Sequence, residues 1–227
     1  MSLSLPEGDG PLRRERLRTA RLYFVCDARP PGDLEALLRA ALTGGADVVQ
    51  LREKELGRAE IERAAGTFRR VADTFSALFI FNDDPELAQI CDADGVHVGK
   101  HDEVEAAREL LGAAAIVGLS THSEEEIADA AGLPADYIAV GPIWETPTKP
   151  GRPGVGLELI SHAAEHAGQP FFAIGGIDPG NAEDVVRAGA ERLCVVRAIR
   201  DSADPEAAAA ALRQAFAVGD RGVAPGG

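Results

Sequence analysis

The chain has 227 residues, of which 45% are hydrophobic and 26% are charged, and its formal net charge is −14. This length fits one or two domains, and α/β barrels of this size fold as one. The acidic balance argues against nucleic-acid binding, which needs a basic surface, and against binding to anionic membranes. No apolar run reaches the roughly 18 residues of a membrane helix.

The three cysteines, Cys26, Cys91 and Cys194, lie far apart in apolar segments and form no CxxC pair. This pattern is typical of small buried side chains rather than of a metal or redox site. It suits the reducing cytoplasm, where we expect the protein to reside. A homodimer is compatible with the sequence, although no segment predicts one.

Strand-like and helix-like segments alternate along the chain. We predict strands at 22–27, 48–53, 77–82, 95–99, 116–121, 137–142, 170–176 and 192–199. Helices are predicted at 33–45, 58–75, 85–93, 103–114, 123–133, 157–168, 181–190 and 204–219. Strand–helix units in this succession predict a parallel sheet closed into a (β/α)8 TIM barrel. The alternative is a doubly wound open sheet, which would leave two exposed edges.

This assignment gives a single barrel domain over residues 21–219. Residues 1–20 are predicted to be an N-terminal extension with a short helix, and residues 220–227 a disordered tail. Within the barrel, Ser123 and Glu126 form the S-x-x-E pattern of a capping box, which supports a helix start at Ser123.

The second predicted strand, VVQLREK, carries polar side chains on one face. Because successive side chains of a strand point to opposite faces, Val49 and Leu51 share one face, whereas Gln50, Arg52 and Lys54 share the other. In (β/α)8 barrels the active site lies at the C-terminal ends of the strands. We therefore expect the polar face to line the barrel mouth.

Polar residues follow other predicted strands at the same end. Asn82 and Asp83 end the third strand, Asp102 follows the fourth, and Ser120 ends the fifth. Few polar groups precede the strands, which favours a site at the mouth rather than at the opposite end of the barrel.

Cations gather near the mouth. They are Arg52, Lys54, Lys149, Arg152 and Arg197. Several converging cations suit a multiply charged anion such as a diphosphate. Asp83 and Asp102 would repel that anion unless a metal intervened, and two carboxylates together with substrate phosphates suit Mg²⁺. The alternative is structural, with both aspartates as helix N-caps and the strand-2 cations as a surface pair.

A second anion site is indicated near the last two strands. Gly175 and Gly176 follow the seventh strand, beside Val196 and Arg197 at the end of the eighth. This is the usual phosphate position of such barrels, and glycine lets backbone N–H groups approach a phosphate closely. A tight turn explains the glycines equally well.

The loop 145–156 is longer than an ordinary connection in this fold. Thr146 and Thr148 offer hydroxyls and Lys149 a charge, so we interpret it as a lid over a phosphorylated substrate, with a plain surface excursion as the alternative. His97, inside the barrel by strand parity, is either a hydrogen-bonded core histidine or a substrate contact.

These motifs resemble one family, thiamine phosphate synthase, over residues 20–205. They are QLREK at 50–54, ND at 82–83, DGVHVGKHD at 94–102, GLSTHS at 118–123, VGPIWETPTKPG at 140–151 and AIGGI at 173–177. Members of this family join a hydroxymethylpyrimidine diphosphate to a thiazole phosphate, which gives thiamine phosphate and pyrophosphate.

The resemblance implies roles for individual residues. The pyrimidine diphosphate would be held by Gln50, Arg52, Lys54, Asn82 and Lys149, and Mg²⁺ by Asp83 and Asp102. Ser120 would contact the pyrimidine. The thiazole phosphate would be held by Thr146, Thr148, Gly176, Val196 and Arg197, although Arg197 stands where Ser is common in the family. The motifs add Leu51, Glu53, Pro147 and Gly175 to the expected substrate-binding set. Arg52, Lys54, Lys149 and Ser120 would be the catalytic residues.

Two other functions remain open at this stage. A thiazole tautomerase on the same fold would need an acid–base group such as His122 but no machinery for a diphosphate. A non-catalytic metabolite-binding barrel is the other alternative. The intact QLREK, ND and TPTKPG motifs favour the synthase.

Overall fold

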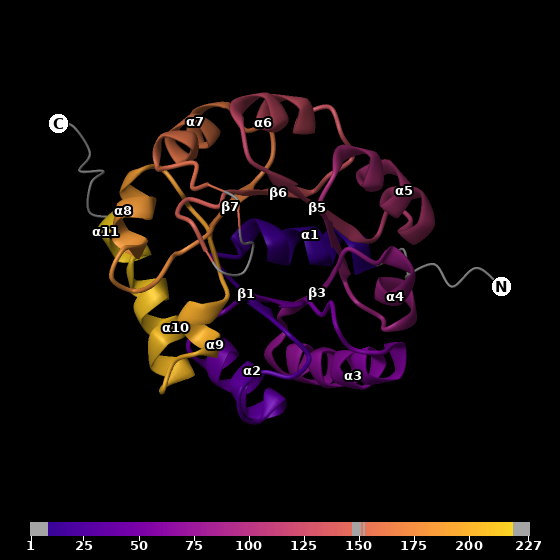
Figure 1. The fold of residues 1–227 in the computed structure, drawn as a ribbon. Coiled ribbons are helices and arrows are strands. Elements are labelled where there is room, and N and C mark those ends of the chain that lie inside the picture. Colours follow the sequence, from indigo (N-terminus) through magenta and orange to yellow (C-terminus); the bar gives the residue numbers. More distant parts are fainter. Residues whose placement is uncertain (1–8, 147–150, 152, 220–227) are drawn as a thin grey trace.

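The computed structural model describes residues 9–146, 151 and 153–219 and forms a closed parallel barrel (Figure 1). Its strands pair in chain order, and β8 returns to β1. The strands are β1 (Leu22–Cys26), β2 (Val48–Leu51), β3 (Leu78–Asn82), β4 (Gly95–Val98), β5 (Ile116–Thr121), β6 (Tyr137–Val140), β7 (Phe171–Ile174) and β8 (Leu193–Val195). The predicted (β/α)8 barrel is confirmed and the open-sheet alternative is wrong.

Helices surround the barrel. They are α1 (Gly10–Thr19), α2 (Leu34–Thr43), α3 (Arg58–Phe75), α4 (Pro85–Ile90), α5 (His101–Leu111), α6 (Glu124–Ala130), α7 (Glu158–His166), α8 (Ala182–Arg187), α9 (Arg197–Arg200), α10 (Pro205–Gln214) and α11 (Phe216–Gly219). None of the described helices is long and apolar enough to cross a membrane. The predicted tail 220–227 lies outside the described residues.

Strand parity divides the apolar residues into two cores. The outer core lies between strands and helices and includes Val49, Leu51 and Phe68. The inner core fills the barrel itself. It consists of Tyr23, Val25, Val48, Leu78, Ile80, Ile116, Tyr137, Phe172 and Cys194 from the strands, with Leu17 and Ala20 from α1. The predicted division of β2 into an outward apolar face and an inward polar face is thus confirmed.

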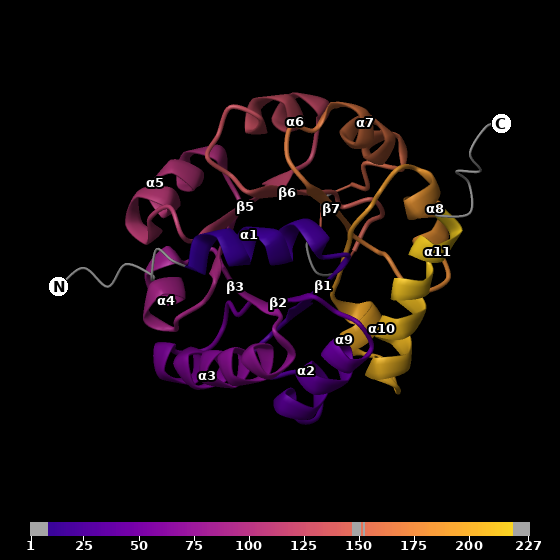
Figure 2. The same ribbon diagram turned by 180° about the vertical axis from the view of Figure 1, so that it is seen from behind.

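Helix α1 covers the N-terminal end of the barrel, which we call the base (Figure 2). Its Arg13 is buried and donates to the carboxylate of Asp94 at 2.9 Å. The neighbouring Arg14 donates to Asp136 at 2.8 Å. The predicted short helix is therefore confirmed, and ion pairs as well as apolar contacts hold it on the base.

Three aspartates each precede an even-numbered strand, and we call them the base carboxylates: Asp47, Asp94 and Asp136. Each accepts a hydrogen bond from the backbone N–H of the preceding odd strand, at Leu22 (3.0 Å), Phe79 (2.8 Å) and Val117 (2.8 Å) respectively. Each also pairs with at least one arginine. The expectation that few polar groups precede the strands is therefore wrong.

The eighth strand is shorter than predicted. It ends at Val195, and the backbone of Val196 turns away (φ −120°, ψ −83°) into α9. Arg197 is therefore the first residue of a helix rather than the end of a strand. The apolar residues of VVRAI fit either structure. In a strand they would be buried in the sheet, and in a helical turn Val196 and Ile199 lie on the same side.

Candidate active site

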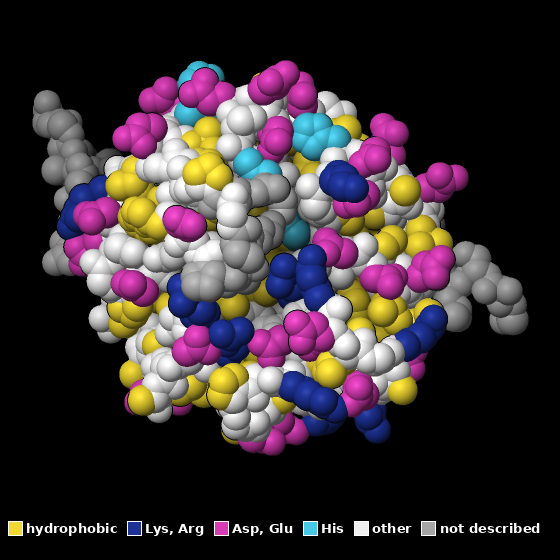
Figure 3. Space-filling view, in the orientation of Figure 1, with side chains coloured by type: hydrophobic (Ala, Val, Ile, Leu, Met, Phe, Trp, Pro, Cys, Tyr) yellow, Lys and Arg dark blue, Asp and Glu magenta, His cyan; other side chains and the backbone are white. Residues whose placement is uncertain are grey.

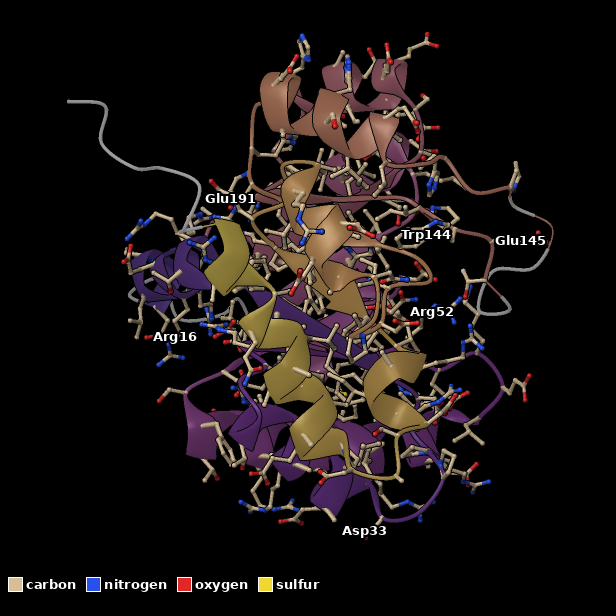
Figure 4. The ribbon with its side chains drawn as sticks, turned by 90° about the vertical axis from the view of Figure 1, so that its left-hand side faces the viewer. Arg16, Asp33, Arg52, Trp144, Glu145 and Glu191 are labelled. Atoms are coloured by element: carbon tan, nitrogen blue, oxygen red, sulfur yellow. The ribbon has the colours of Figure 1, made fainter. Side chains whose placement is uncertain are left out.

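A cavity of about 900 Å³ opens at the C-terminal ends of the strands. The predicted residues that line it are Gln50, Arg52, Lys54, Asn82, Asp83, Ser120, Thr146, Gly175, Gly176, Val196 and Arg197. On this face of the molecule, cationic and acidic side chains surround a central depression (Figure 3). Seen from the side, Arg52, Trp144 and Glu145 lie towards this end, whereas Arg16 of α1 lies at the opposite end (Figure 4).

Several predicted residues do not line the cavity. Leu51 is completely buried in the outer core, so its side chain cannot reach a ligand in the barrel. Asp102 is exposed in the first turn of α5 and is not among the described lining residues. Pro147, Thr148, Lys149 and Arg152 lie outside the described residues.

Glu53 shapes the loop after β2 instead of lining the cavity. Its carboxylate accepts backbone hydrogen bonds from Ala28 (3.2 Å), Lys54 (2.8 Å) and Glu55 (2.9 Å). Burial alone would raise the pKa of Glu53, but these N–H donors outweigh it and lower the pKa. The carboxylate therefore holds the backbone that carries Arg52 and Lys54.

Asp83 is placed by its backbone at the edge of the cavity. Its φ of 65° lies in the left-handed region, and its N–H donates to the carbonyl of His97 at 2.8 Å. The cap of α4 is Asp84, which accepts from Leu87 N–H at 2.8 Å. The alternative of Asp83 as a helix cap is therefore wrong. An uncommon backbone conformation at a cavity edge is the kind of feature that accumulates at functional sites.

The cations of the cavity are weakly paired. Lys54 Nζ lies 3.6 Å from the carboxylate of Asp83, and both side chains are about half exposed, at 58% and 50%. Arg52 and Arg197 form no ion pair with another residue in the described part of the chain. The nearby Asp201 pairs with Arg200 at 2.7 Å. Two guanidinium groups are thus available to an anion.

The two glycines after β7 let the backbone pack tightly beside the cavity. Gly175 has φ 109°, and a Cβ atom there would lie 2.4 Å from Cα of Pro142. Gly176 has φ 73°, and Asn181 Nδ2 donates to its carbonyl at 2.9 Å. A side chain at either position would displace the loop after β6, so the glycines serve the turn. The buried Gly175 and the half-buried Gly176 also line the cavity.

Beneath the cavity, five buried polar side chains form a continuous hydrogen-bonded chain. Gln50 Nε2 donates to the hydroxyl of Tyr23 at 2.7 Å, and this hydroxyl lies 3.0 Å from that of Tyr137. His97 Nδ1 lies 3.1 Å from the Tyr137 hydroxyl, and His97 Nε2 lies 3.0 Å from Ser120 Oγ. The alternative of His97 as a hydrogen-bonded core residue is confirmed, although His97 also borders the cavity.

Sequence reasoning missed both tyrosines of this chain and several lining residues, among them Val25, Ile174 and Cys194. Strand parity applied to β1 and β6 would have placed Tyr23 and Tyr137 inside the barrel with Val25. His122 also lines the cavity, with Nδ1 in contact with the carbonyl of Gly141.

Among the residues that the structure describes, no group of three or more His, Cys, Asp and Glu side chains is placed to hold a metal ion. Mg²⁺ commonly uses one or two carboxylates with water and substrate phosphates rather than a cage of protein ligands. Asp83, half exposed at the cavity edge, fits that use.

Comparison with known proteins agrees with this geometry. The sequence model of the family described as thiamine monophosphate synthase matches residues 22–199. A thiamine-phosphate synthase of Saccharopolyspora erythraea is 46% identical over 220 residues, which cover 92% of this chain and 98% of that protein. One from Thermus thermophilus is 47% identical over 199 residues, which cover 86% of this chain and 96% of the relative.

The fold comparison points the same way. A solved thiamine phosphate pyrophosphorylase from Pyrococcus furiosus superposes with a TM-score of 0.80 at 32% identity, covering 91% of this chain and 98% of that one. A solved 3-hexulose-6-phosphate synthase, at 23% identity and a TM-score of 0.60, shares the fold. From the matched family model and the two bacterial relatives, this chain belongs to the thiamine monophosphate synthase family.

Proposed function

We propose that this protein is the transferase that joins 4-amino-2-methyl-5-hydroxymethylpyrimidine diphosphate to 4-methyl-5-hydroxyethylthiazole phosphate. The products are thiamine phosphate and pyrophosphate. Family membership supports the reaction, because the matched relatives bear the synthase name over nearly their whole length. The observation that carries it is one cavity of about 900 Å³ with residues from β2, β3, β5 and the loops after β7 and β8 on its walls.

The reaction breaks the bond between the pyrimidine methylene carbon and the diphosphate oxygen, and forms a bond from that carbon to the thiazole nitrogen. The electron-rich aminopyrimidine stabilises the methylene cation, so no protein nucleophile is needed. The protein must neutralise the departing pyrophosphate and hold both substrates in line.

The diphosphate would meet the cations of the cavity. Arg52 offers a planar fork and Lys54 a point charge, and both are suited to phosphate oxygens. Asn82 borders the same wall, and Lys149 is the further cation that we assign to this role. Lys54 would exchange its 3.6 Å contact with Asp83 for the substrate. Mg²⁺, held by Asp83 and by Asp102 as the second predicted ligand, would supply charge neutralisation on the diphosphate.

The other substrate groups would occupy the remaining walls. We assign the pyrimidine to Gln50 and Ser120, which are both buried and polar. The thiazole phosphate is assigned to Thr146, Thr148, Gly176 and the Val196–Arg197 backbone. Thr146 and Gly176 line the cavity together with Arg197, so a phosphate there would be separated from the diphosphate wall formed by β2 and β3.

The test is a reaction with both substrates and Mg²⁺, in which we follow thiamine phosphate and pyrophosphate. We expect both products in equal amounts, and neither when one substrate or Mg²⁺ is left out. Isomerisation of a thiazole phosphate without pyrophosphate release would instead favour the tautomerase, with His122 as its acid–base group. Binding without any turnover would favour a metabolite-binding barrel.

The metal proposal has its own test. We expect Asp83→Ala to keep the fold, because Asp84 and not Asp83 caps α4, and to lose most Mg²⁺-dependent turnover. Asp102→Ala, measured beside it, tells whether the exposed carboxylate on α5 takes part. Glu105→Ala, at an exposed position of the same helix, is the matched control. Full activity and unchanged Mg²⁺ dependence of Asp83→Ala would contradict the assignment.

A further inference from the structure

The buried chain from Gln50 to Ser120 crosses the floor of the cavity, and we call its five residues the floor chain: Gln50, Tyr23, Tyr137, His97 and Ser120. They come from β2, β1, β6, β4 and β5 respectively. Its two ends line the cavity, whereas the tyrosines lie in the inner core below. Two side chains assigned to the pyrimidine are therefore joined through the interior of the barrel.

Each link of the floor chain carries one hydrogen. All five side chains are buried, with Tyr23 at 1% and Tyr137 at 0% exposure. Burial raises the pKa of both phenols, so both stay protonated and each donates once. A buried donor without an acceptor costs about 1–3 kcal/mol. The hydrogens must therefore all point along the chain in the same direction.

The amide of Gln50 sets this direction. Because its N–H donates to Tyr23, the Tyr23 hydroxyl donates to Tyr137, and Tyr137 donates to His97 Nδ1. Neutral His97 then carries its hydrogen on Nε2 and donates to Ser120. At one end a ligand meets the acceptor Gln50 Oε1, beside the second hydrogen of Nε2. At the other end the Ser120 hydroxyl has its own hydrogen to donate and one further lone pair.

We propose that the floor chain fixes the hydrogen-bonding polarity of Gln50 and Ser120 together and thereby selects a ring with a donor beside an acceptor. A 4-aminopyrimidine has this edge, with its amino group for Gln50 and the adjacent ring nitrogen for Ser120. The 4-oxo analogue presents the reverse pattern. For Gln50 to offer its amide N–H in place of Oε1, the amide would have to turn over, and the links to Tyr23, Tyr137 and His97 would reverse with it. Tyr23, Tyr137 and His97 are thus positioning residues. This inference rests on the proposed function.

The neighbouring residues of the barrel leave room for Tyr137, the middle residue of the floor chain. A Cβ atom at Gly118 of β5 would lie 2.5 Å from the Tyr137 hydroxyl and 2.1 Å from Cζ of its ring. The Tyr137 ring stacks on His97 with centroids 5.5 Å apart and meets Phe172 edge-on at 5.4 Å. The absence of a side chain at Gly118 therefore leaves the space in which Tyr137 can reach both of its partners.

The first test needs no substrate. We expect ¹⁵N NMR of the ligand-free protein, near neutral pH, to show His97 as the neutral tautomer protonated on Nε2. Tyr137→Phe keeps the ring but removes the hydroxyl that donates to His97 Nδ1. In this variant the tautomer of His97 that is protonated on Nδ1 should become populated. An Nδ1-protonated His97 in the unaltered protein would overturn the proposal.

The second test uses both substrates. For Tyr137→Phe we expect the KM for the aminopyrimidine diphosphate to rise about 5- to 10-fold, from the loss of one buried hydrogen bond of about 1–1.4 kcal/mol. The KM for the thiazole phosphate should stay within about 2-fold. The preference for the 4-amino over the 4-oxo diphosphate, measured by competition, should fall by the same factor as the first KM rises. Tyr23→Phe should behave alike.

Phe172→Leu is the matched control, because Phe172 packs against both tyrosines, at 5.2 and 5.4 Å, without a hydroxyl. It should lower stability but leave the 4-amino preference unchanged. If the unaltered protein is active and both Tyr→Phe variants keep the full preference, the floor chain has no selective role. If the unaltered protein makes no thiamine phosphate, the proposed function fails. The NMR measurement of the His97 tautomer then still tests the direction of the hydrogen bonds in the floor chain.

Discussion

Both ends of the barrel carry arginine and aspartate side chains, but these are closely paired at the base and weakly paired at the mouth. At the base, Asp94 pairs with Arg13 and Arg69, each at 2.9 Å, and the carboxylate is 6% exposed. At the mouth, Arg52 has no ion pair with a described residue, and Lys54 meets Asp83 only at 3.6 Å with both half exposed. The Asp94 carboxylate accepts from both arginines and from the Phe79 N–H, whereas the mouth cations have no such close partners among the described residues.

This difference separates charges that stabilise the fold from charges that serve a ligand. A buried ion pair needs close geometry and further hydrogen bonds to offset the loss of hydration, and the base carboxylates have both. An exposed cation costs little to keep unpaired, and it gains most from a multiply charged ligand that excludes water. Mutations at the two ends should therefore give opposite phenotypes.

The largest effect is expected at the base. Asp94→Ala leaves two arginines without their shared carboxylate and should lower the free energy of unfolding by about 3–5 kcal/mol. Urea denaturation measures it. Asp129→Ala, at an exposed position of α6, should change the value by less than about 0.5 kcal/mol. A loss of similar size in both variants would show that the base pairs contribute nothing special.

The next effect comes from strand β2, where the two faces can be compared within one element. Leu51→Ala opens a cavity in the outer core and should destabilise the fold by about 2–5 kcal/mol. The folded fraction should keep its KM for the pyrimidine diphosphate, because Leu51 is buried away from the cavity. A raised KM with unchanged stability would mean that the two faces of β2 are exchanged.

Arg52→Ala should do the reverse. The loss of a charge-assisted hydrogen bond costs about 1.5–3 kcal/mol, or roughly 10- to 100-fold in kcat/KM. Stability should stay within about 0.5 kcal/mol, since no described residue pairs with Arg52. Steady-state kinetics and urea denaturation together decide it. Arg63→Ala, at an exposed position of α3, should change neither quantity.

The smallest effect is expected at Arg197, which is exposed at the start of α9. Arg197→Ser should weaken thiazole phosphate binding about 2- to 5-fold, in line with the roughly 0.5–1 kcal/mol of an exposed ion pair. Binding of the pyrimidine diphosphate should stay the same, and Arg197→Lys should recover part of the loss. Titration of each substrate separately tests this, and equal weakening of both would remove Arg197 from the thiazole site.

Much of the mouth could be predicted from the sequence because strand parity is local. The alternation in VVQLREK is enough to put Leu51 outside and Gln50 inside, and the barrel then brings Asn82 and Ser120 to the same end. The predicted end of β8 was wrong because the apolar residues of VVRAI are compatible with a helical turn as well as with a strand. No local pattern distinguishes them.

The base was missed for a different reason. Each base carboxylate follows a helix–strand connection, where a lone aspartate resembles an ordinary loop residue. The signal was a repeat: Ala46–Asp47, Ala93–Asp94 and Ala135–Asp136 each stand directly before an even strand. The arginine partners lie far away in the sequence, 81 residues in the case of Arg13 and Asp94, so pairing could not be inferred without the fold.

The position of α1 on the base also bears on how the protein is made. Its Arg14 is translated 122 residues before Asp136, its ion-pair partner. At about 5–20 residues per second, synthesis separates the two by roughly 6–24 s. A single helix of this length is marginal in water without packing, and β1 waits still longer for its β8 neighbour, where Leu22 pairs with Leu193. Helix α1 is therefore made well before its partners and is among the last elements to pack, and a chain that stops short of β8 cannot close the barrel through the β1–β8 pairing.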